Sequence, residues 1–426
     1  MFHFGRTVAG MSTVTYTEPS RDSSGPPAAE IICGPAAARI ISRPLALVFL
    51  AEFCALTGFY LLLSVTPMYA AAAGVGSAGA GLVTGVLLLG TVTAELTAPI
   101  LMKRHEHRTL LAAGAVLLGA PALALLASGP LAVIMAVSVV RGFGFGLVTV
   151  VTGTLTAVLL PPGRRGEGLG LFGVVACVPG VVALPSGVWL AGHYGYPVVV
   201  GLAAAAALVP LAAFPWLTGG TGRQAAGAGA AGQPAGLLGG LRQDGQLRLS
   251  LIFAASTVAA GVVVSFLPLA AGVSGTVAAI GLLAQALTAT IGRWWAGRHG
   301  DRHGHSGLLV PGLVIAFLGM AAMIWLASPA AVIAGMCLFG AGFGIIQNAT
   351  FVLMIDRMPV SGPGTASALW NLAYDAGYGA GPAAFGLFAG HTGYPAAFAL
   401  TGALMLVALP AARRERTADA AAADIA

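Results

Sequence analysis

The stretch "AGHYGYP" at Ala191–Pro197 recurs almost unchanged as "AGHTGYP" at Ala389–Pro395, 198 residues further along the chain. The same interval joins "KRHEHRTLLAAG", which begins at Lys103, to "DRHGHSGLLVPG", which begins at Asp301. A constant interval over so much of a chain indicates an internal duplication, and duplicated halves adopt the same topology. We therefore expect two structural repeats.

The composition identifies the medium in which these repeats fold. Of the 426 residues, 58% are hydrophobic and only 8% are charged, whereas a soluble domain has about 25% charged residues. Apolar runs close to ~18 residues or longer recur along the chain, and each can cross a bilayer as a helix. They do not alternate apolar and polar residues, which excludes a membrane β-barrel. The sequence predicts an all-α, polytopic membrane protein.

Glycines, prolines and charges divide the apolar sequence into twelve candidate membrane helices. A Gly/Ala-rich stretch without a periodic apolar face separates the sixth from the seventh, so the helices form two six-helix pseudo-repeats. The predicted helices begin near Leu45, Gly81, Thr109, Leu131, Gly168, Pro197, Leu249, Gly275, Leu308, Ala330, Thr365 and Pro395. The predicted parts are a disordered cytoplasmic tail (1–43), a first bundle (44–218), a cytoplasmic linker (219–248), a second bundle (249–412) and a cytoplasmic tail (413–426).

Basic residues mark one side of the predicted helices. Apart from Arg141, every Lys and Arg lies in a tail, in the linker, or in or beside every second loop. Arg293 is counted here as lying at the end of the eighth helix. Loops rich in Lys and Arg stay in the cytoplasm. We therefore expect a plasma (inner) membrane protein with both termini in the cytoplasm.

The charge distribution, the cysteines and the absence of two motifs argue against several other classes of protein. The net charge of +6 gathers in no patch or stripe, so no nucleic-acid partner is expected. The four cysteines are far apart, and neither a zinc-protease motif nor an ATP-binding Walker motif occurs. We expect no metal, no cofactor and no enzyme activity.

A family resemblance rests first on "GRHGDRHGHSG" at Gly297–Gly307. It is similar to the cytoplasmic signature of the major facilitator superfamily, G-x-x-x-D-R-x-G-x-R/K, although His305 and Ser306 stand where basic residues are usual. Four residues match the signature: Gly297, Asp301, Arg302 and Gly304. "RGFGFG" at Arg141 resembles the helix 4 motif of that family, and "GYGAGP" at Gly377 resembles an antiporter motif, here in helix 11.

The resemblance implies a cytoplasmic gate formed by the matching residues. Asp301 would act as a latch, because ion pairs near a surface are weak enough to form and break; a plain solvated loop charge is the other interpretation. The first copy of the signature has Lys103 in place of the aspartate. We group Glu95, in the last turns of helix 2, with the gate as a brace for the loop that follows.

Ionisable residues within the predicted membrane helices are the proton-coupling candidates, since each costs ~2.5–3.5 kcal/mol to insert. Asp375 is predicted to load and unload protons, or else to be permanently paired with a basic residue. Arg141 is predicted to tune a carboxylate, as the family implies, or to pair with Glu52 or a backbone carbonyl. Glu52 is either a second proton or cation site or extends toward the cytoplasm.

Other polar and aromatic residues of helices 8, 10 and 11 line a cavity or hydrogen-bond between helices. They are Gln285, Gln347, Asn348, Trp370, Asn371 and Tyr374.

Together these features predict a secondary active transporter that works by alternating access. The resemblance to bacterial drug and metabolite efflux permeases implies proton-coupled efflux of an amphipathic small molecule. A proton-coupled importer or facilitator of a small metabolite remains open, as does a non-transporting membrane sensor. The partners are then the substrate, protons and the lipid bilayer, and a monomer is sufficient.

Overall fold

A computed structural model describes residues 41–127, 130–160, 165–217, 239–243, 245–358 and 363–423. Within these ranges all regular secondary structure is helical. Most of the predicted N-terminal tail (1–40) and of the predicted linker (219–238 and 244) lies outside the described residues. Ile40–Ala426 forms one compact unit.

The first set of helices follows the predicted order, and short 3₁₀ turns extend several of them. Its elements are α1 (Arg43–Leu63), α2 (Val65–Ala72), α3 (Gly76–Arg104), α4 (His107–Gly119), η1 (Ala120–Ala127), α5 (Leu131–Leu159), α6 (Arg165–Tyr194), α7 (Tyr196–Leu208), η3 (Val209–Ala212) and η4 (Phe214–Trp216).

The second set repeats this arrangement. Its elements are α10 (Gln246–Phe266), η6 (Leu267–Leu269), α11 (Gly275–His303), η7 (Ser306–Leu308), α12 (Leu309–Ala322), η8 (Met323–Trp325), α13 (Pro329–Asp356), α14 (Pro363–Thr392) and α15 (Tyr394–Ala423). The predicted starts at Leu131 and Gly275 agree with the structure, and the largest difference is at the second membrane helix, which begins at Gly76 rather than Gly81.

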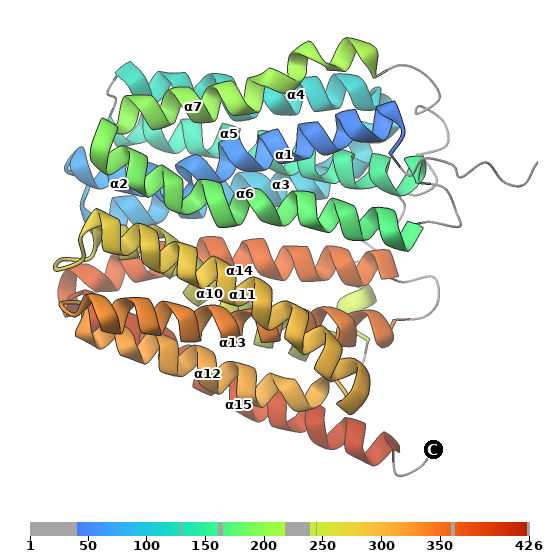
Figure 1. Cartoon of the computed structure of the whole chain (residues 1–426), viewed down its shortest axis with the longest axis vertical. Helices are drawn as coiled ribbons and strands as arrows, with labels where there is room; N and C mark the ends of the chain where they lie inside the picture. Colours follow the sequence, from blue (N-terminus) through green and yellow to red (C-terminus); the bar gives the residue numbers. More distant parts are fainter. Residues whose placement is uncertain are drawn as a thin grey trace, which may run out of the picture. The chain divides into compact units, whose positions relative to one another are not determined.

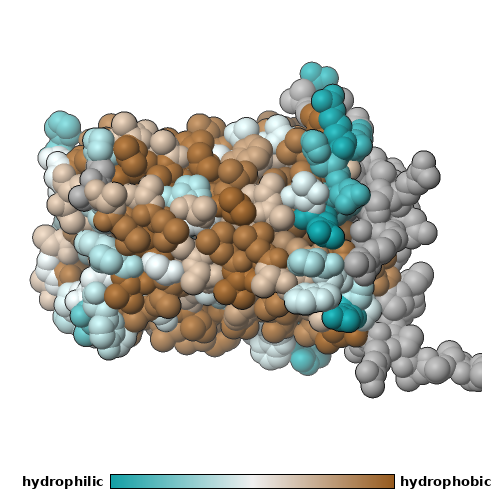
Figure 2. Space-filling model, turned by 90° about the horizontal axis from the view of Figure 1, so that it is seen from above, coloured by the Kyte–Doolittle hydropathy of each residue, from teal (hydrophilic) through white to brown (hydrophobic). Residues whose placement is uncertain are grey.

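Eleven segments in the described part of the chain are long and apolar enough to span a membrane. α14 is not among them, although it has 30 residues. It is too polar, because Asn371, Asp375, three large polar aromatic residues and several glycines lie along it. With α14 the twelve expected helices are present. Figure 2 shows apolar residues over the middle of the helices and hydrophilic residues toward their ends, as lipid on the sides and water at both ends require.

The two sets of helices meet along two helix pairs (Figure 1). α3 of the first set packs along α14 of the second, and α6 packs against α11. The duplication relates one pair to the other, because α3 corresponds to α11 and α6 corresponds to α14, so the interface between the sets follows from the duplication predicted from the sequence. Side chains that α3 and α14 direct toward one another lie between the two sets.

Glycines bring α3 and α14 together where α3 begins. A side chain on Gly81 would collide with the carbonyl oxygen of Pro382, and one on Gly386 would collide with the backbone of Ser77. The Ser77 hydroxyl donates to the Gly386 carbonyl at 2.9 Å. We call these four residues the α3–α14 seal, because here the helix backbones touch and leave no passage between them.

Two further contacts between the sets lie close to this seal. The hydroxyls of Thr84 on α3 and Ser265 on α10 are 3.0 Å apart, and Ser64, between α1 and α2, donates to the Val264 carbonyl at 2.7 Å. All of these contacts are at the end of the helices opposite the arginine-rich loops. The sets are therefore joined at that end in this conformation.

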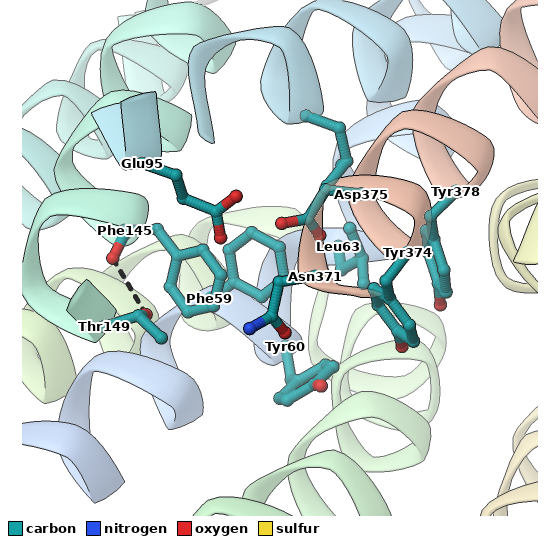
Figure 3. Close-up of a pocket in the computed structure, with 11 residues that line it drawn as sticks. Phe59, Tyr60, Leu63, Glu95, Phe145, Thr149, Asn371, Tyr374, Asp375 and Tyr378 are labelled. Atoms are coloured by element: carbon teal, nitrogen blue, oxygen red, sulfur yellow. Dashed lines mark hydrogen bonds between the residues drawn. The ribbon is translucent and has the colours of Figure 1, made fainter. Parts of the chain in front are cut away.

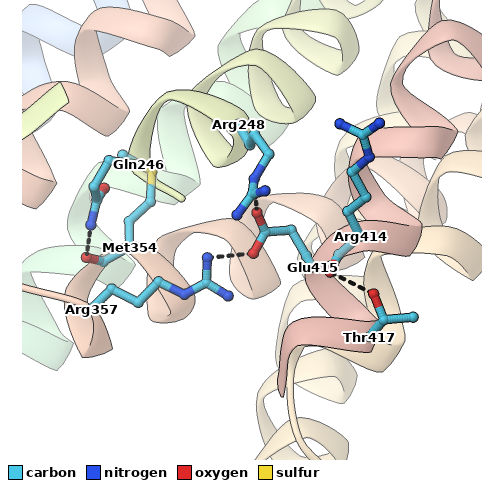
Figure 4. A network of polar contacts seen from close by, with 7 residues as sticks. All are labelled: Gln246, Arg248, Met354, Arg357, Arg414, Glu415 and Thr417. Carbon is cyan, nitrogen blue, oxygen red and sulfur yellow. Dashed lines mark hydrogen bonds and ion pairs between the residues drawn. The ribbon is translucent and has the colours of Figure 1, made fainter. Parts of the chain in front are cut away.

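A buried carboxylate fastens the opposite end of the second set (Figure 4). Glu415 of α15 has no exposed side-chain surface; it accepts from Arg248 at 2.6 Å and forms an ion pair with Arg357. Nearby, the amide of Gln246 donates to the Met354 carbonyl at 2.7 Å. Because a charge without its partner is costly to bury, these contacts hold α10, α13 and α15 together as one block.

Candidate functional site

A cavity of about 120 Å³ lies between the two sets of helices (Figure 3). Its walls come from α1, α3 and α5 on one side and from α14 on the other. The lining residues are Phe59, Tyr60, Leu63, Leu88, Glu95, Phe145, Thr149, Asn371, Tyr374, Asp375 and Tyr378. A site shared by the two halves is where an alternating-access transporter binds its substrate.

Two carboxyl groups from opposite sets meet in this cavity. Asp375 of α14 is only 8% exposed, and its carboxyl group faces that of Glu95 on α3 (Figure 3). The two carboxyl groups are close enough to influence each other electrostatically. A hydrogen bond between two carboxyl groups requires a proton on one of them, since a carboxylate is an acceptor only. In this geometry the pair is suited to share one proton between the two sets.

The glycines of "GYGAGP" position Asp375. A side chain on Gly377 would collide with Thr257 of α10, and one on Gly381 with the Val258 carbonyl of the same helix. A side chain on Gly379 would come within 2.7 Å of Leu88 on α3. α14 is therefore held tightly between α10 and α3, which fixes the depth at which Asp375 enters the cavity.

Aromatic rings form the rest of the cavity wall. Tyr374 and Tyr378 stack at 5.4 Å on one face of α14, and Phe59 stacks on Phe145 at 3.8 Å on the opposite side. Tyr60 of α1 also lines the cavity. The site thus combines flat apolar surfaces, hydroxyl groups and a pair of acids, which suits a small molecule with an aromatic body and one polar or cationic group.

Arg141 and Glu52 do not take part in this cavity. Arg141, 1% exposed, donates to the carbonyls of Leu118 and Gly58, both at 3.2 Å. Glu52, 2% exposed, accepts from the Thr152 hydroxyl at 2.6 Å. The structure does not bring the three predicted proton-coupling residues together, and it gives Arg141 the backbone partners that were its other interpretation.

We expect Arg141→Met to lower stability rather than coupling. The substitution removes two buried hydrogen bonds from a charged donor, worth about 1.5–3 kcal/mol each, and should lower the midpoint of thermal unfolding measured by tryptophan fluorescence. In the fraction that remains folded, the response of transport to a pH gradient should equal that of wild type. Loss of that response in stably folded Arg141→Met protein would instead give Arg141 a coupling role.

The match to a protein family is extensive. Residues 48–382 match the model of the Major Facilitator Superfamily, which is more than half of the chain. The chain belongs to the Major Facilitator Superfamily. No curated protein sequence matches it. The superfamily resemblance and the all-α, twelve-helix fold expected from the sequence are confirmed, and members of this superfamily are transporters rather than enzymes.

Solved transporter structures share the fold. The nucleoside transporter NupG is 14% identical with a TM-score of 0.69, covering 88% of this chain and 99% of its own. A bacterial homologue of the human lysosomal transporter Spinster, in an inward-facing and occupied conformation, is 16% identical with a TM-score of 0.72, covering 88% and 96%. At these identities the similarity concerns the fold alone.

The superfamily's cytoplasmic signature has a clear local structure. Gly304 ends α11 with a positive φ of 86°, a conformation that favours glycine. Asp301 is 76% exposed and lies 3.9 Å from Nε2 of His305. Arg302 is exposed, and Gly297 lies beside Asn348 of α13. In this conformation Asp301 contacts its own loop, and its role as a latch stays a prediction.

Two of the six predicted cavity residues, Asn371 and Tyr374, line the cavity. Trp370, one turn earlier on α14, stacks on Phe253 at 4.4 Å and donates to Thr350 at 3.2 Å. The three predicted amide residues of α11 and α13 lie where these two helices pack together. Gln285 is buried beside Gly340, Gln347 accepts from Arg293, and Asn348 lies beside Gly297.

Arg293 was misplaced by the sequence interpretation. It donates to Oε1 of Gln347 and lies 3.7 Å from the Cys177 sulfur of α6, where the two sets of helices meet. α11 continues to His303, so Arg293 lies roughly 15 Å from the helix end at ~1.5 Å per residue. The helical sequence that continues past "RWW" was the signal that could have placed Arg293 within the membrane helix. Glu95 was predicted to brace the cytoplasmic loop, but it lines the cavity instead, because α3 continues well past it to Arg104.

Proposed function

We propose that this superfamily member is a proton-coupled transporter that expels an amphipathic small molecule, a drug or secondary metabolite, by alternating access. The observation that supports the proposal is the Glu95–Asp375 pair, which lies in a cavity between the two sets of helices and has one carboxyl group from each. The proposal includes a plasma (inner) membrane location with the arginine-rich end in the cytoplasm, and function as a monomer.

The proton on this pair would control the distance between the two sets. With one proton, the two carboxyl groups attract each other through a hydrogen bond, and the sets stay together. Without the proton, the two carboxylates that face each other in the cavity repel strongly, because little water screens their charges. Loss of the proton would therefore drive α3 away from α14 and favour opening of the seal between them.

The substrate would replace the proton. A cationic or donor group entering the cavity can neutralise the carboxyl pair as the proton does, while the rings of Phe59, Tyr374 and Tyr378 cover its apolar body. The proton and the substrate would then bind in turn rather than together, which is the requirement for exchange. Exchange of one proton for one monovalent cation moves no net charge, so the pH gradient alone drives it; for a neutral substrate each proton that enters would add ~2.3 kcal/mol per ~100 mV of membrane potential.

A proton-coupled importer or a facilitator of a small metabolite is the second candidate. Asn371, Thr149 and the tyrosine hydroxyls line the cavity and can hydrogen-bond a substrate with several hydroxyl groups. The nucleoside transporter NupG, which has the same fold, handles substrates of that kind. Uridine is therefore the matched probe for this alternative.

Transport in vesicles of purified protein tests the two candidates. Proteoliposomes acidic inside should accumulate ethidium, an aromatic cation, several-fold over empty liposomes, and a protonophore should abolish the accumulation. Uridine uptake driven by an acidic exterior would instead support import. Ethidium movement that ignores the pH gradient would contradict proton coupling.

A further inference from the structure

The last turns of α11 carry two parallel rows of aromatic and basic side chains at intervals of four residues. We call the six residues the α11 ladder: Trp294, Arg298 and Arg302 in one row, and Trp295, His299 and His303 in the other. They surround a shallow hollow of about 210 Å³ on the surface of the helix. None of them takes part in the cavity between the two sets of helices.

The rows are internally ordered. The guanidinium carbon of Arg298 lies 5.3 Å from the ring centre of Trp294. In the other row, Trp295 stacks on His299 at 4.8 Å, and His299 stacks on His303 at 4.4 Å. Stacking on a ring holds a guanidinium in place while leaving its N–H groups free to bind an anion.

An exposed apolar stripe leads along α11 to the ladder. Ile280, Leu283, Leu287 and Ile291 are 45%, 38%, 46% and 62% exposed, and they lie at helical spacing on one side of the helix. Trp294 continues the stripe at 63% exposed. On a membrane helix such a stripe faces lipid chains, and tryptophan at its end lies at the depth of the lipid headgroups.

The charges around the hollow favour an anion. Arg298 and Arg302 are both exposed and belong to the hollow. Asp301 is the acidic residue of the same turn, but it is not among the lining residues, and its carboxylate lies 3.9 Å from His305. The site therefore offers two guanidinium groups to a negatively charged group located where the apolar stripe ends.

We propose that the α11 ladder binds an anionic phospholipid, with an acyl chain along the Ile280–Ile291 stripe and the phosphate at Arg298 and Arg302. A soluble anion would use the guanidinium groups but not the stripe, whereas a phospholipid uses both. The tryptophan rings would lie at the glycerol level between the two parts. The assignment to the cytoplasmic leaflet rests on the proposed orientation, and the inference is independent of the substrate and of proton coupling.

Native mass spectrometry of the purified full-length chain tests this inference. Added phosphatidylglycerol should remain bound to the wild type in preference to phosphatidylcholine. Arg298→Gln with Arg302→Gln should weaken retention of phosphatidylglycerol about thirty-fold, since each basic residue near an anionic lipid surface contributes about a factor of five. The double lysine variant, Arg298→Lys with Arg302→Lys, should retain most of the binding.

Arg413→Gln with Arg416→Gln is the matched control, because it removes the same charge from exposed positions of α15. An equal loss of phosphatidylglycerol in this control, or full retention in the α11 glutamine variant, would overturn the proposal. Displacement of the lipid by millimolar inorganic phosphate would also overturn it and indicate a free-anion site. Thermal unfolding of each variant shows whether lost binding reflects lost structure.

Discussion

Asp375→Asn is expected to abolish the dependence of substrate accumulation on the proton gradient. The amide can still hydrogen-bond to Glu95 across the cavity, but it cannot take up or release a proton at any pH that the protein survives. At one proton per substrate, a gradient of two pH units can sustain a concentration ratio of about 100, and in this variant the ratio should fall to about 1. Ethidium accumulation in proteoliposomes measures it.

Further variants define what such a result means. Glu95→Gln should have the same effect, since the shared proton needs both carboxyl groups. Asp356→Asn is the matched control, because this aspartate is exposed at the end of α13, and it should accumulate substrate as wild type does. Normal gradient-driven accumulation by Asp375→Asn would remove the carboxyl pair from the coupling mechanism.

Gly81→Val is expected to prevent closure of the α3–α14 seal. The new side chain would collide with the Pro382 carbonyl, and over-packing of this kind costs about 1–3 kcal/mol. Transport that passes through the sealed conformation should therefore fall between about 5-fold and 150-fold. In a background without native cysteines, a cysteine at Ser265, which is fully buried in this structure, should become accessible to an impermeant thiol reagent.

Gly170→Val provides the comparison for that experiment. A side chain at Gly170 of α6 meets no atom within 4 Å, so the same substitution adds the same bulk without a collision. It should transport normally and leave the cysteine at position 265 protected. If Gly81→Val also transports at the wild-type rate, the close approach of α3 and α14 is not required in the transport cycle.

Hydropathy, glycine spacing and charge were sufficient to predict the membrane helices, because insertion into lipid depends on local composition. Even α14 was predicted, since the 198-residue interval aligns it with the fifth predicted helix. The internal duplication also predicted that two similar halves would face each other. These features follow from stretches of roughly 20 residues, which a single sequence shows directly.

The partner of Asp375 could not be predicted in this way. Glu95 lies 280 residues earlier on a helix of the other half, and only tertiary packing brings the two together. Arg293 was misjudged because a basic residue near the end of an apolar run is usually a loop charge, whereas α11 extends well past it. For Arg141 the sequence left two interpretations open; the structure shows its side chain donating to two backbone carbonyls, and its role in coupling stays a prediction.

The polarity of α14 has a consequence for how the chain assembles during synthesis. Among the described membrane helices, α14 is the one that is not apolar enough to count as a membrane span by itself. It gains little free energy from contact with lipid and depends on packing against α3 and α10, which enclose it. α3 is one of the first six helices, which are synthesised before α14. α14, the eleventh membrane helix, can therefore pack in place only when the first half is already inserted. The first half thus acts as an intramolecular chaperone for the second, and two separately synthesised halves would need each other to complete insertion.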